Sequence, residues 1–196
     1  MAKKGSDHKV PVQARGALRF NREQSLVEIS TRDLHTPNRD FPAHLTWIQC
    51  IAGSVVVYFA QILPPRRVIS LVGVSLNDDA FNALLGSFNA GFRRSVIEMA
   101  AKRPGDELRL RSEDLKEVPP DRTFMVTANL GRTTVSTLGG QIDWFQLSPW
   151  EMRKLSEDLP GVRDPVGVLT VSLNNALLAD LIQQCDELAA SLWGGT

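Results

Sequence analysis

The sequence predicts an α+β protein built from two similar β-rich units, each an antiparallel sheet followed by one long helix, packed together as a pseudo-dimer. Three observations predict this fold. A four-residue motif recurs 97 residues later, apolar runs typical of strands are separated by Gly-containing turns, and an amphipathic helical pattern follows each copy of the motif. Such an internal repeat is typical of supersecondary units that bury their apolar faces against each other.

The motif is Val-Ser-Leu-Asn, at residues 74–77 and again at 171–174, and apolar residues face apolar residues on both sides of it. In the first copy, residues 68–74 are almost all apolar, which predicts a buried strand. Asn77 suits a helix N-cap, and Asp78 and Asp79 suit the first helical turn, where carboxylates oppose the helix dipole. Apolar residues then follow at spacings of three and four, both after Asn77 and after Asn174.

Upstream of the motif, the two halves align at an offset of 85 residues, so that residues 58–64 match 143–149. A Gly-containing turn precedes each of these segments, at residues 52–54 and 139–140. Further strands are expected before the turns, and these are Leu45–Ile51 and Thr133–Leu138, preceded by Leu26–Thr31 and Phe124–Leu130. Each half is therefore predicted to contain four strands and then a helix.

The offset grows from 85 to 97 because the second half carries twelve extra residues. These begin with Ser148-Pro149-Trp150-Glu151, a capping box with proline at the first helical position, which predicts a short helix. We therefore divide the chain into a flexible basic arm (1–22), a first sheet-plus-helix repeat (23–100), a charged linker (101–122) and a second repeat (123–196). The linker carries twelve charged residues, six of each sign.

Composition narrows the classes of function. The 196 residues include 22 Lys and Arg against 22 Asp and Glu, and 43% are hydrophobic, as in ordinary globular proteins. A net charge of zero argues against a nucleic-acid partner. No apolar run reaches the roughly 20 residues of a membrane-spanning helix, and the polar N-terminus does not resemble a signal peptide. We expect a cytoplasmic protein with no membrane partner, in which Cys50 and Cys185 are free thiols rather than a disulfide or redox pair.

The run from His44 to Phe92 resembles a group of small bacterial β-β-β-α domains of unknown function. The segments that carry the likeness are Val55-Val56-Val57-Tyr58-Phe59, Ile62-Leu63-Pro64-Pro65, Val72-Gly73-Val74-Ser75 and Leu84-Leu85. The resemblance implies a fold but no activity. The plan of four strands and a helix also resembles the export chaperone SecB, to which the segment Val126–Gly131 is similar; this likeness concerns fold alone.

No sequence motif indicates catalysis. The chain has no phosphate-binding loop, no dinucleotide-binding glycine motif, no nucleophile elbow and no zinc-ligand spacing among its three histidines. We therefore predict no catalytic residue, no metal and no cofactor. The polar loop with Asp33, His35 and Arg39 is the best place for a catalytic group without a local motif. Arg66 and Arg67 follow two prolines and could bind a phosphate or carboxylate, although we favour a solvated hairpin end as their explanation.

The remaining candidates are aromatic. Trp47 and Trp144 lie in predicted strands and are expected in the core or on a sheet face. Trp150 lies in the inserted helix and Trp193 in the last helical turn, where exposed tryptophan suggests a protein interface. We predict partner binding through Trp150, Trp193, Arg66 and Arg67.

These observations favour a non-enzymatic adaptor or assembly subunit that binds a protein partner, or a further copy of itself, through sheet edges and aromatic surface. Two alternatives stay open. One is a SecB-like binder of unfolded polypeptides, which needs an exposed apolar groove. The other is an enzyme or small-ligand binder with a site between the two halves.

Overall fold

The structure is a computed structural model that describes residues 18–21, 26–29, 34–63, 67–102, 123–157 and 163–193. These residues form an α+β protein with two four-stranded sheets, one two-stranded sheet and four helices. The chain divides into two compact units, Met1–Leu34 with Pro149–Asp164, and His35–Ser148 with Pro165–Thr196. The predicted basic arm lies outside the described residues as far as residue 17, and the predicted linker lies outside them from residue 103.

The smaller unit contains strands β1 (Leu18–Asn21) and β2 (Leu26–Ile29), which pair antiparallel, and helix α3 (Pro149–Ser156). The predicted inserted helix is therefore confirmed, with Pro149 as its first residue. Glu151 lies in its first turn, and its Oε2 accepts a hydrogen bond of 2.8 Å from the main-chain N–H of Arg163. That bond and the nearby Lys154 ammonium lower the pKa of Glu151, against the effect of burial.

One four-stranded sheet of the larger unit has the order β4-β5-β6-β7. Its strands are β4 (Leu45–Ile51), β5 (Ser54–Leu63), β6 (Arg67–Leu76) and β7 (Thr123–Thr127). The turn between β4 and β5 consists of Ala52 and Gly53, with φ of 50° and 80°. Two residues with positive φ make the tight hairpin turn that the Gly signal predicted.

The other sheet has the order β3-β10-β9-β8. Its strands are β3 (Asp40–Pro42), β8 (Leu130–Val135), β9 (Gly140–Gln146) and β10 (Val166–Leu173). Strand β3 was not predicted, because three residues that end in proline show no alternation. The strand predicted at Leu26–Thr31 exists as β2, but it pairs with β1 and joins neither large sheet. The expectation that it opens the first sheet was therefore wrong.

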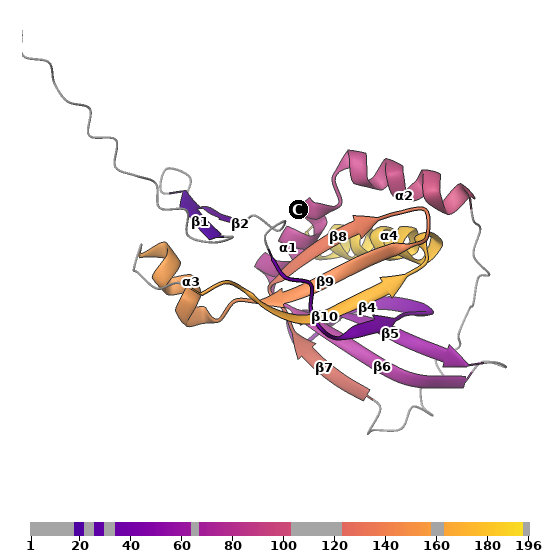
Figure 1. The fold of residues 1–196 in the computed structure, drawn as a ribbon, viewed down its shortest axis with the longest axis horizontal. Coiled ribbons are helices and arrows are strands. Elements are labelled where there is room, and N and C mark those ends of the chain that lie inside the picture. Colours follow the sequence, from indigo (N-terminus) through magenta and orange to yellow (C-terminus); the bar gives the residue numbers. More distant parts are fainter. Residues whose placement is uncertain are drawn as a thin grey trace, which may run out of the picture. The chain divides into compact units, whose positions relative to one another are not determined.

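Each large sheet takes its fourth strand from the other half of the chain, as Figure 1 shows. Strand β7 pairs parallel with β6, and β3 pairs parallel with β10. Residue pairs in one sheet correspond to residue pairs in the other: the offset between corresponding residues is 85 before the insert and 97 after it. Thus Val57 pairs with Val74, and Ile142 pairs with Val171. The edge pairs Val74–Val126 and Val171–Phe41 are related in the same way.

Three helices belong to the larger unit: α1 (Asp78–Ser87), α2 (Ala90–Lys102) and α4 (Asn175–Trp193). Both predicted caps are present, since Asn77 Oδ1 accepts from the Ala80 N–H and Asn174 Oδ1 from the Leu177 N–H. The single long helix expected after Asn77 is instead two helices. Asn89 causes the break, because its side chain accepts from the Phe92 N–H and starts α2.

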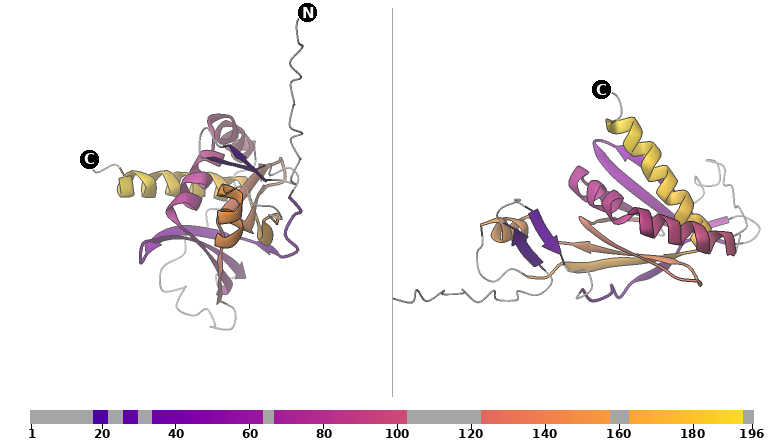
Figure 2. Two further views of the ribbon diagram at one scale, coloured as in Figure 1. Left: turned by 90° about the vertical axis from the view of Figure 1, so that its left-hand side faces the viewer. Right: turned by 90° about the horizontal axis from the view of Figure 1, so that it is seen from above.

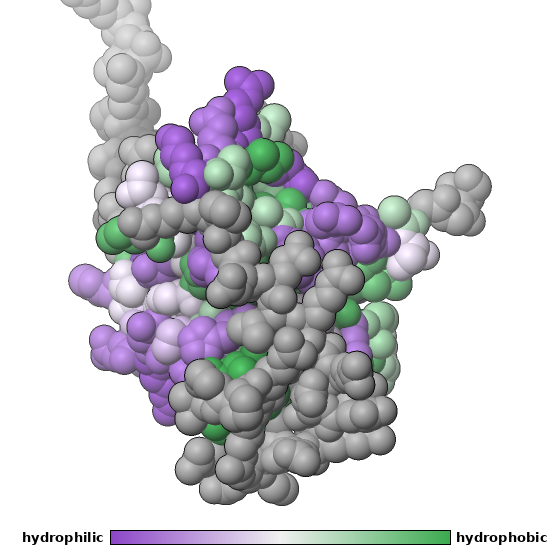
Figure 3. All heavy atoms as spheres, turned by 90° about the vertical axis from the view of Figure 1, so that its right-hand side faces the viewer, coloured by the Kyte–Doolittle hydropathy of each residue, from purple (hydrophilic) through white to green (hydrophobic). Residues whose placement is uncertain are grey.

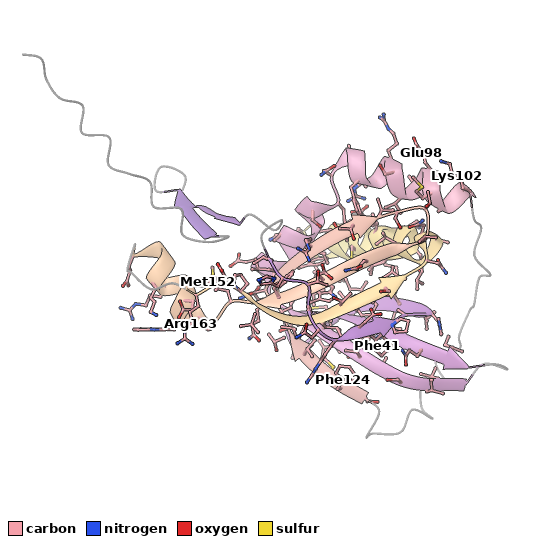
Figure 4. All side chains as sticks on the ribbon, in the orientation of Figure 1. Phe41, Glu98, Lys102, Phe124, Met152 and Arg163 are labelled. Carbon is pink, nitrogen blue, oxygen red and sulfur yellow. The ribbon has the colours of Figure 1, made fainter. Side chains whose placement is uncertain are left out.

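The helices are exchanged like the strands, since α1 packs on β8 and α4 packs on β4. Helices α2 and α4 lie side by side (Figure 2), where the Arg93 guanidinium makes two hydrogen bonds with the Asp186 carboxylate. A single core forms between the sheets and helices, with Phe59, Phe81 and Trp144 among its fully buried side chains. Figure 4 shows Phe41 of β3 close to Phe124 of β7, and their ring centroids are 6.3 Å apart.

Candidate functional site

The residues predicted to bind a partner belong to different elements of the fold. Trp150 is 59% exposed on α3, with Lys154 Nζ 5.7 Å from its ring centroid. Trp193 is 45% exposed at the end of α4, and its ring lies 5.7 Å from that of Phe81. The two tryptophans belong to different compact units. Arg66 lies outside the described residues, and Arg67 begins β6 opposite Leu63.

The polar loop and the acidic helix start belong to different elements. Asp33 lies outside the described residues, while His35 and Arg39 are exposed in the segment that leads into β3. Asp78 and Asp79 are exposed in the first turn of α1, as expected for charges that oppose the helix dipole. Within the described part of the chain, no group of three or more His, Cys, Asp or Glu side chains could hold a metal ion.

An open hollow of about 550 Å³ lies at the end of sheet β3-β10-β9-β8. His44 lines it, but His44 Nδ1 lies 3.0 Å from both the main-chain N and O of Ile62. The other lining residues carry neither charge nor thiol, and they are Ala43, Thr134, Val135, Ser136, Leu138, Gly139, Gly140, Gln141, Ser172, Leu173 and Asn174. The hollow therefore offers hydroxyl, amide and main-chain groups but no nucleophile paired with an acid or base.

The most distinctive surface is the face of sheet β4-β5-β6-β7 that points away from the shared core. One cross-strand row on this face consists of Trp47, Tyr58, Gly73 and Met125, one residue from each strand. The Trp47 and Tyr58 rings are stacked, with centroids 4.9 Å apart and planes 13° apart. Offset stacking at this distance adds to the stabilisation from burial alone. The Met125 side chain lies across Gly73 and is 53% exposed.

Apolar residues surround this row. Ala60, Ile62 and Val68 are buried and pack with Leu45, Trp47 and Leu71, and all six of these described side chains belong to the sheet itself. We call the surface formed by Leu45, Trp47, Tyr58, Leu71 and Met125 the aromatic face. None of the outward side chains that the structure describes on these four strands is charged; they are Leu45, Trp47, Gln49, Ile51, Ser54, Val56, Tyr58, Ala60, Ile62, Val68, Leu71, Gly73, Ser75, Thr123, Met125 and Thr127.

The corresponding row of the other sheet has the opposite character. At the same offsets, Trp47 and Tyr58 correspond to Arg132 and Asp143, which pair across β8 and β9. The Arg132 guanidinium donates to Asp143 Oδ2 through Nε at 2.9 Å and Nη2 at 2.5 Å. Gln141 and Thr170 donate to the other carboxylate oxygen, at 2.7 and 2.8 Å. Four hydrogen bonds stabilise the carboxylate, whose side chain is only 2% exposed.

Residues 35–39 cover this charged row. Arg132 Nη2 donates to the Thr36 hydroxyl at 3.1 Å, Pro37 packs on Gly167, and the Arg39 carbonyl accepts from the Thr170 N–H at 2.7 Å. Any side chain at Gly167 would crowd Pro37, since a Cβ there would lie 3.0 Å from Pro37 Cα. The chain thus covers one outer face with its own segment, while the aromatic face stays partly exposed.

Sequence reasoning located Trp47 in a strand but did not select it as a binding residue. The repeat itself contained a sign that Trp47 and Tyr58 lie on the outer side of the sheet. At an offset of 85, Trp47 corresponds to Arg132 and Tyr58 to Asp143. Charged residues are expected on the outer side of a sheet, so the aromatic pair had to point outward too. On the side seen in Figure 3, described hydrophobic residues reach the surface in several areas.

No protein-family model matches the chain, and no curated protein or solved structure is significantly similar to it.

Proposed function

We propose that this chain is a non-enzymatic assembly subunit that binds a protein partner through the aromatic face. The observation that carries the proposal is the half-buried stack of Trp47 and Tyr58, next to the exposed Met125, on a face whose described side chains carry no charge. Trp, Tyr and Met are enriched where proteins bind one another, and charged residues are depleted at the centre of such surfaces.

We further propose that the larger unit is an internal duplication whose halves pack as a pseudo-dimer with exchanged first strands and helices. The support is the agreement in register at offsets of 85 and 97, and the paired helix caps Asn77 and Asn174. His44 and Asn129 add to it, since each bonds to the main chain 18 residues ahead. The resemblance to small β-β-β-α domains would then apply to each half.

Within this duplication the two outer faces have diverged. One half carries the charged residues Arg132 and Asp143, and residues 35–39 cover this pair. The other half carries Trp47 and Tyr58 at the corresponding positions. In this proposal the charged half is structural and the aromatic half binds the partner, which gives the two copies separate roles.

A cytoplasmic setting fits the cysteines. Both are free, and Cys50 is exposed on β4 while Cys185 is buried in the core. Thiols of this kind are usual where the compartment is reducing. Trp150 and Trp193 stay as proposed secondary contact points, since both are substantially exposed.

The alternative is a chaperone-like binder of unfolded chains, with the plan of SecB. The same aromatic face favours it, because an uncharged apolar surface accepts many unrelated segments. The adaptor and the chaperone differ in how many partners they hold, and one experiment separates them.

That experiment is affinity capture of the tagged chain from native lysate, with the bound proteins quantified by mass spectrometry. Met125→Lys places a charge on the aromatic face, and Gln49→Lys places one next to it, in the neighbouring cross-strand row. Thr134→Lys is the matched control, because Thr134 is exposed and corresponds to Gln49 on the other sheet. The proposal expects one partner in near-equal amount, lost in both test variants and kept in the control. Many unrelated polypeptides would indicate the chaperone, and a partner that all three variants retain would refute the role of this face.

A further inference from the structure

The open hollow at the end of sheet β3-β10-β9-β8 is bordered by polar side chains that the fold holds in place. Its volume of about 550 Å³ is in the range of small-ligand sites. Among its lining residues, Gln141, Ser172, Asn174 and His44 each bond to the protein through one polar group. Each of them keeps further hydrogen-bonding capacity that no described residue uses. We call these four residues the polar set.

Two members of the polar set offer acceptors. Gln141 and Ser172 are opposite each other on β9 and β10, and both are half-buried. Gln141 Nε2 donates to Asp143 Oδ1 at 2.7 Å, which leaves Gln141 Oε1 as an acceptor. Ser172 Oγ donates to Asp40 Oδ1 at 2.9 Å, and its lone pairs still accept. The bonds to the carboxylates therefore fix how these two side chains present their oxygens.

The other two members are exposed and keep a nitrogen for a ligand. Asn174 Oδ1 accepts from the Leu177 N–H at 2.7 Å as the cap of α4, which leaves Asn174 Nδ2 as a donor. His44 Nδ1 lies 3.0 Å from the main-chain N of Ile62, which leaves His44 Nε2 without a described partner. The polar set thus combines half-buried acceptors with an exposed donor and a ring nitrogen.

Two of these free atoms are not needed for the fold, as a comparison of the two halves shows. At an offset of 85, Gln141 corresponds to Val56, which is 4% exposed, and His44 corresponds to Asn129. Asn129 uses both polar atoms of its side chain on the main chain of Leu147, whereas His44 makes the same kind of contact with one ring nitrogen. Both differences between the halves therefore add a free polar atom at the hollow.

We propose that the hollow binds a small neutral molecule rich in hydroxyl groups, a monosaccharide or similar polyol, in addition to the partner proposed above. A hydroxyl both donates and accepts, so adjacent hydroxyls of one ring match the acceptors Gln141 and Ser172 and the donor Asn174 at once. The lining has no carboxylate, ammonium or guanidinium group, so a charged ligand would lose water without gaining a counter-charge. Side chains that are already held by bonds lose little further freedom when a ligand binds.

Proton–nitrogen correlation NMR of the isotope-labelled full chain tests the inference, with D-glucose, D-galactose and myo-inositol as the probes. We expect at least one probe to shift the main-chain amide signals of Gly140 and Leu173, and the side-chain amide signals of Gln141 and Asn174, to saturation. The indole signal of Trp47 should stay in place, because Trp47 lies on the other sheet.

The sharpest variant is Asn174→Asp, because aspartate keeps the oxygen that caps α4 and removes the Nδ2 donor. The variant should bind the probe about tenfold more weakly than the parent, the effect of losing one hydrogen bond. Asn77→Asp is the matched control, since Asn77 caps α1 in the same way and does not line the hollow. Its affinity should equal that of the parent, and thermal melting curves establish that both variants fold.

Three results would each overturn the inference. In the first, none of the three probes shifts these signals to saturation. In the second, Asn174→Asp binds the probe as tightly as the parent. In the third, the charged sugars glucuronate or glucosamine bind more tightly than glucose, which rejects a neutral ligand. None of these results bears on partner binding through the aromatic face, because that face belongs to the other sheet.

Discussion

Asn129 binds the main chain of Leu147 as His44 binds that of Ile62, and in both cases the two residues are 18 apart in sequence. Asn129 Nδ2 donates to the Leu147 carbonyl at 2.6 Å, and its Oδ1 accepts from the Leu147 N–H at 2.8 Å. His44 Nδ1 lies 3.0 Å from the corresponding two atoms of Ile62. Each side chain lies just before the first strand of a hairpin and bonds to the main chain at the end of the second strand, β4 with β5 for His44 and β8 with β9 for Asn129.

This equivalence predicts how the two positions respond to substitution. Asn129→Ala leaves the main-chain groups of the buried Leu147 without partners, which should lower the free energy of unfolding by about 2 kcal/mol. His44→Ala should destabilise in the same sense, whereas His44→Asn should retain stability, because asparagine performs this role in the other half. Urea denaturation measures all three. A His44→Asn variant as unstable as His44→Ala would contradict the equivalence of the halves.

The buried ion pair predicts non-additive effects. Asp143→Leu alone leaves the Arg132 guanidinium, 17% exposed, without its carboxylate, and should cost about 3–5 kcal/mol. Arg132→Met alone should cost a similar amount. The double variant should be more stable than either single one, because neither charge is then left unpaired. A double-mutant cycle by urea denaturation checks this, and additive single effects would show that the pair is not coupled.

The cysteines predict selective reactivity. Burial raises the pKa of Cys185 to about 12, helped by the charge of Asp186 and opposed by Arg93, while Cys50 is exposed. A thiol reagent at pH 8 should therefore label one cysteine per native chain, at Cys50, and both in denaturant. Peptide mapping identifies the labelled site. Rapid labelling of Cys185 in the native protein would contradict its place in the core.

The same shift predicts a pH dependence. Above the usual thiol pKa of 9.0 the unfolded chain loses the Cys185 proton, while the folded chain keeps it up to about pH 12. The folded state then binds more protons, so stability falls as pH rises through this window. Cys185→Ala should show a shallower fall than the parent between pH 9 and 11 in urea denaturation, and equal slopes would contradict the shift.

Strand exchange predicts that the halves stay together without a covalent link. A protease site inserted between residues 106 and 118 allows the chain to be cut after folding. Strand β7 pairs with β6 of the first half and β3 with β10 of the second, so the two fragments should co-elute on gel filtration and separate in denaturant. Fragments that separate in native buffer would contradict the exchanged arrangement.

Much of the fold could be predicted from local pattern. The strand at Leu45–Ile51, the hairpin turn at Gly53 and the caps Asn77 and Asn174 follow from residue spacing, because local chemistry decides them. Two features could not be predicted. The three residues of β3 show no periodicity, and the break at Asn89 lies within an unbroken apolar pattern.

The aromatic face was harder to predict because it depends on pairing between strands distant in sequence. Trp47 and Trp144 both lie in strands, yet Trp144 is fully buried and Trp47 is on the outer side. Only the register that joins Trp47 with Tyr58, and Gly73 with Met125, makes a surface of them. The exposure of Trp150 and Trp193 was easier to predict, because each lies near the end of a predicted helix.

Hydroxyl-radical footprinting, with oxidation read by mass spectrometry, tests the binding role of the aromatic face most directly. The chain is compared in dilute solution and in its associated or captured state. We predict that Trp47, Tyr58 and Met125 become protected on association, while Leu138, which is 82% exposed in the turn between β8 and β9, oxidises equally in both states. Protection confined to Trp150 or Trp193, with Met125 unchanged, would contradict it.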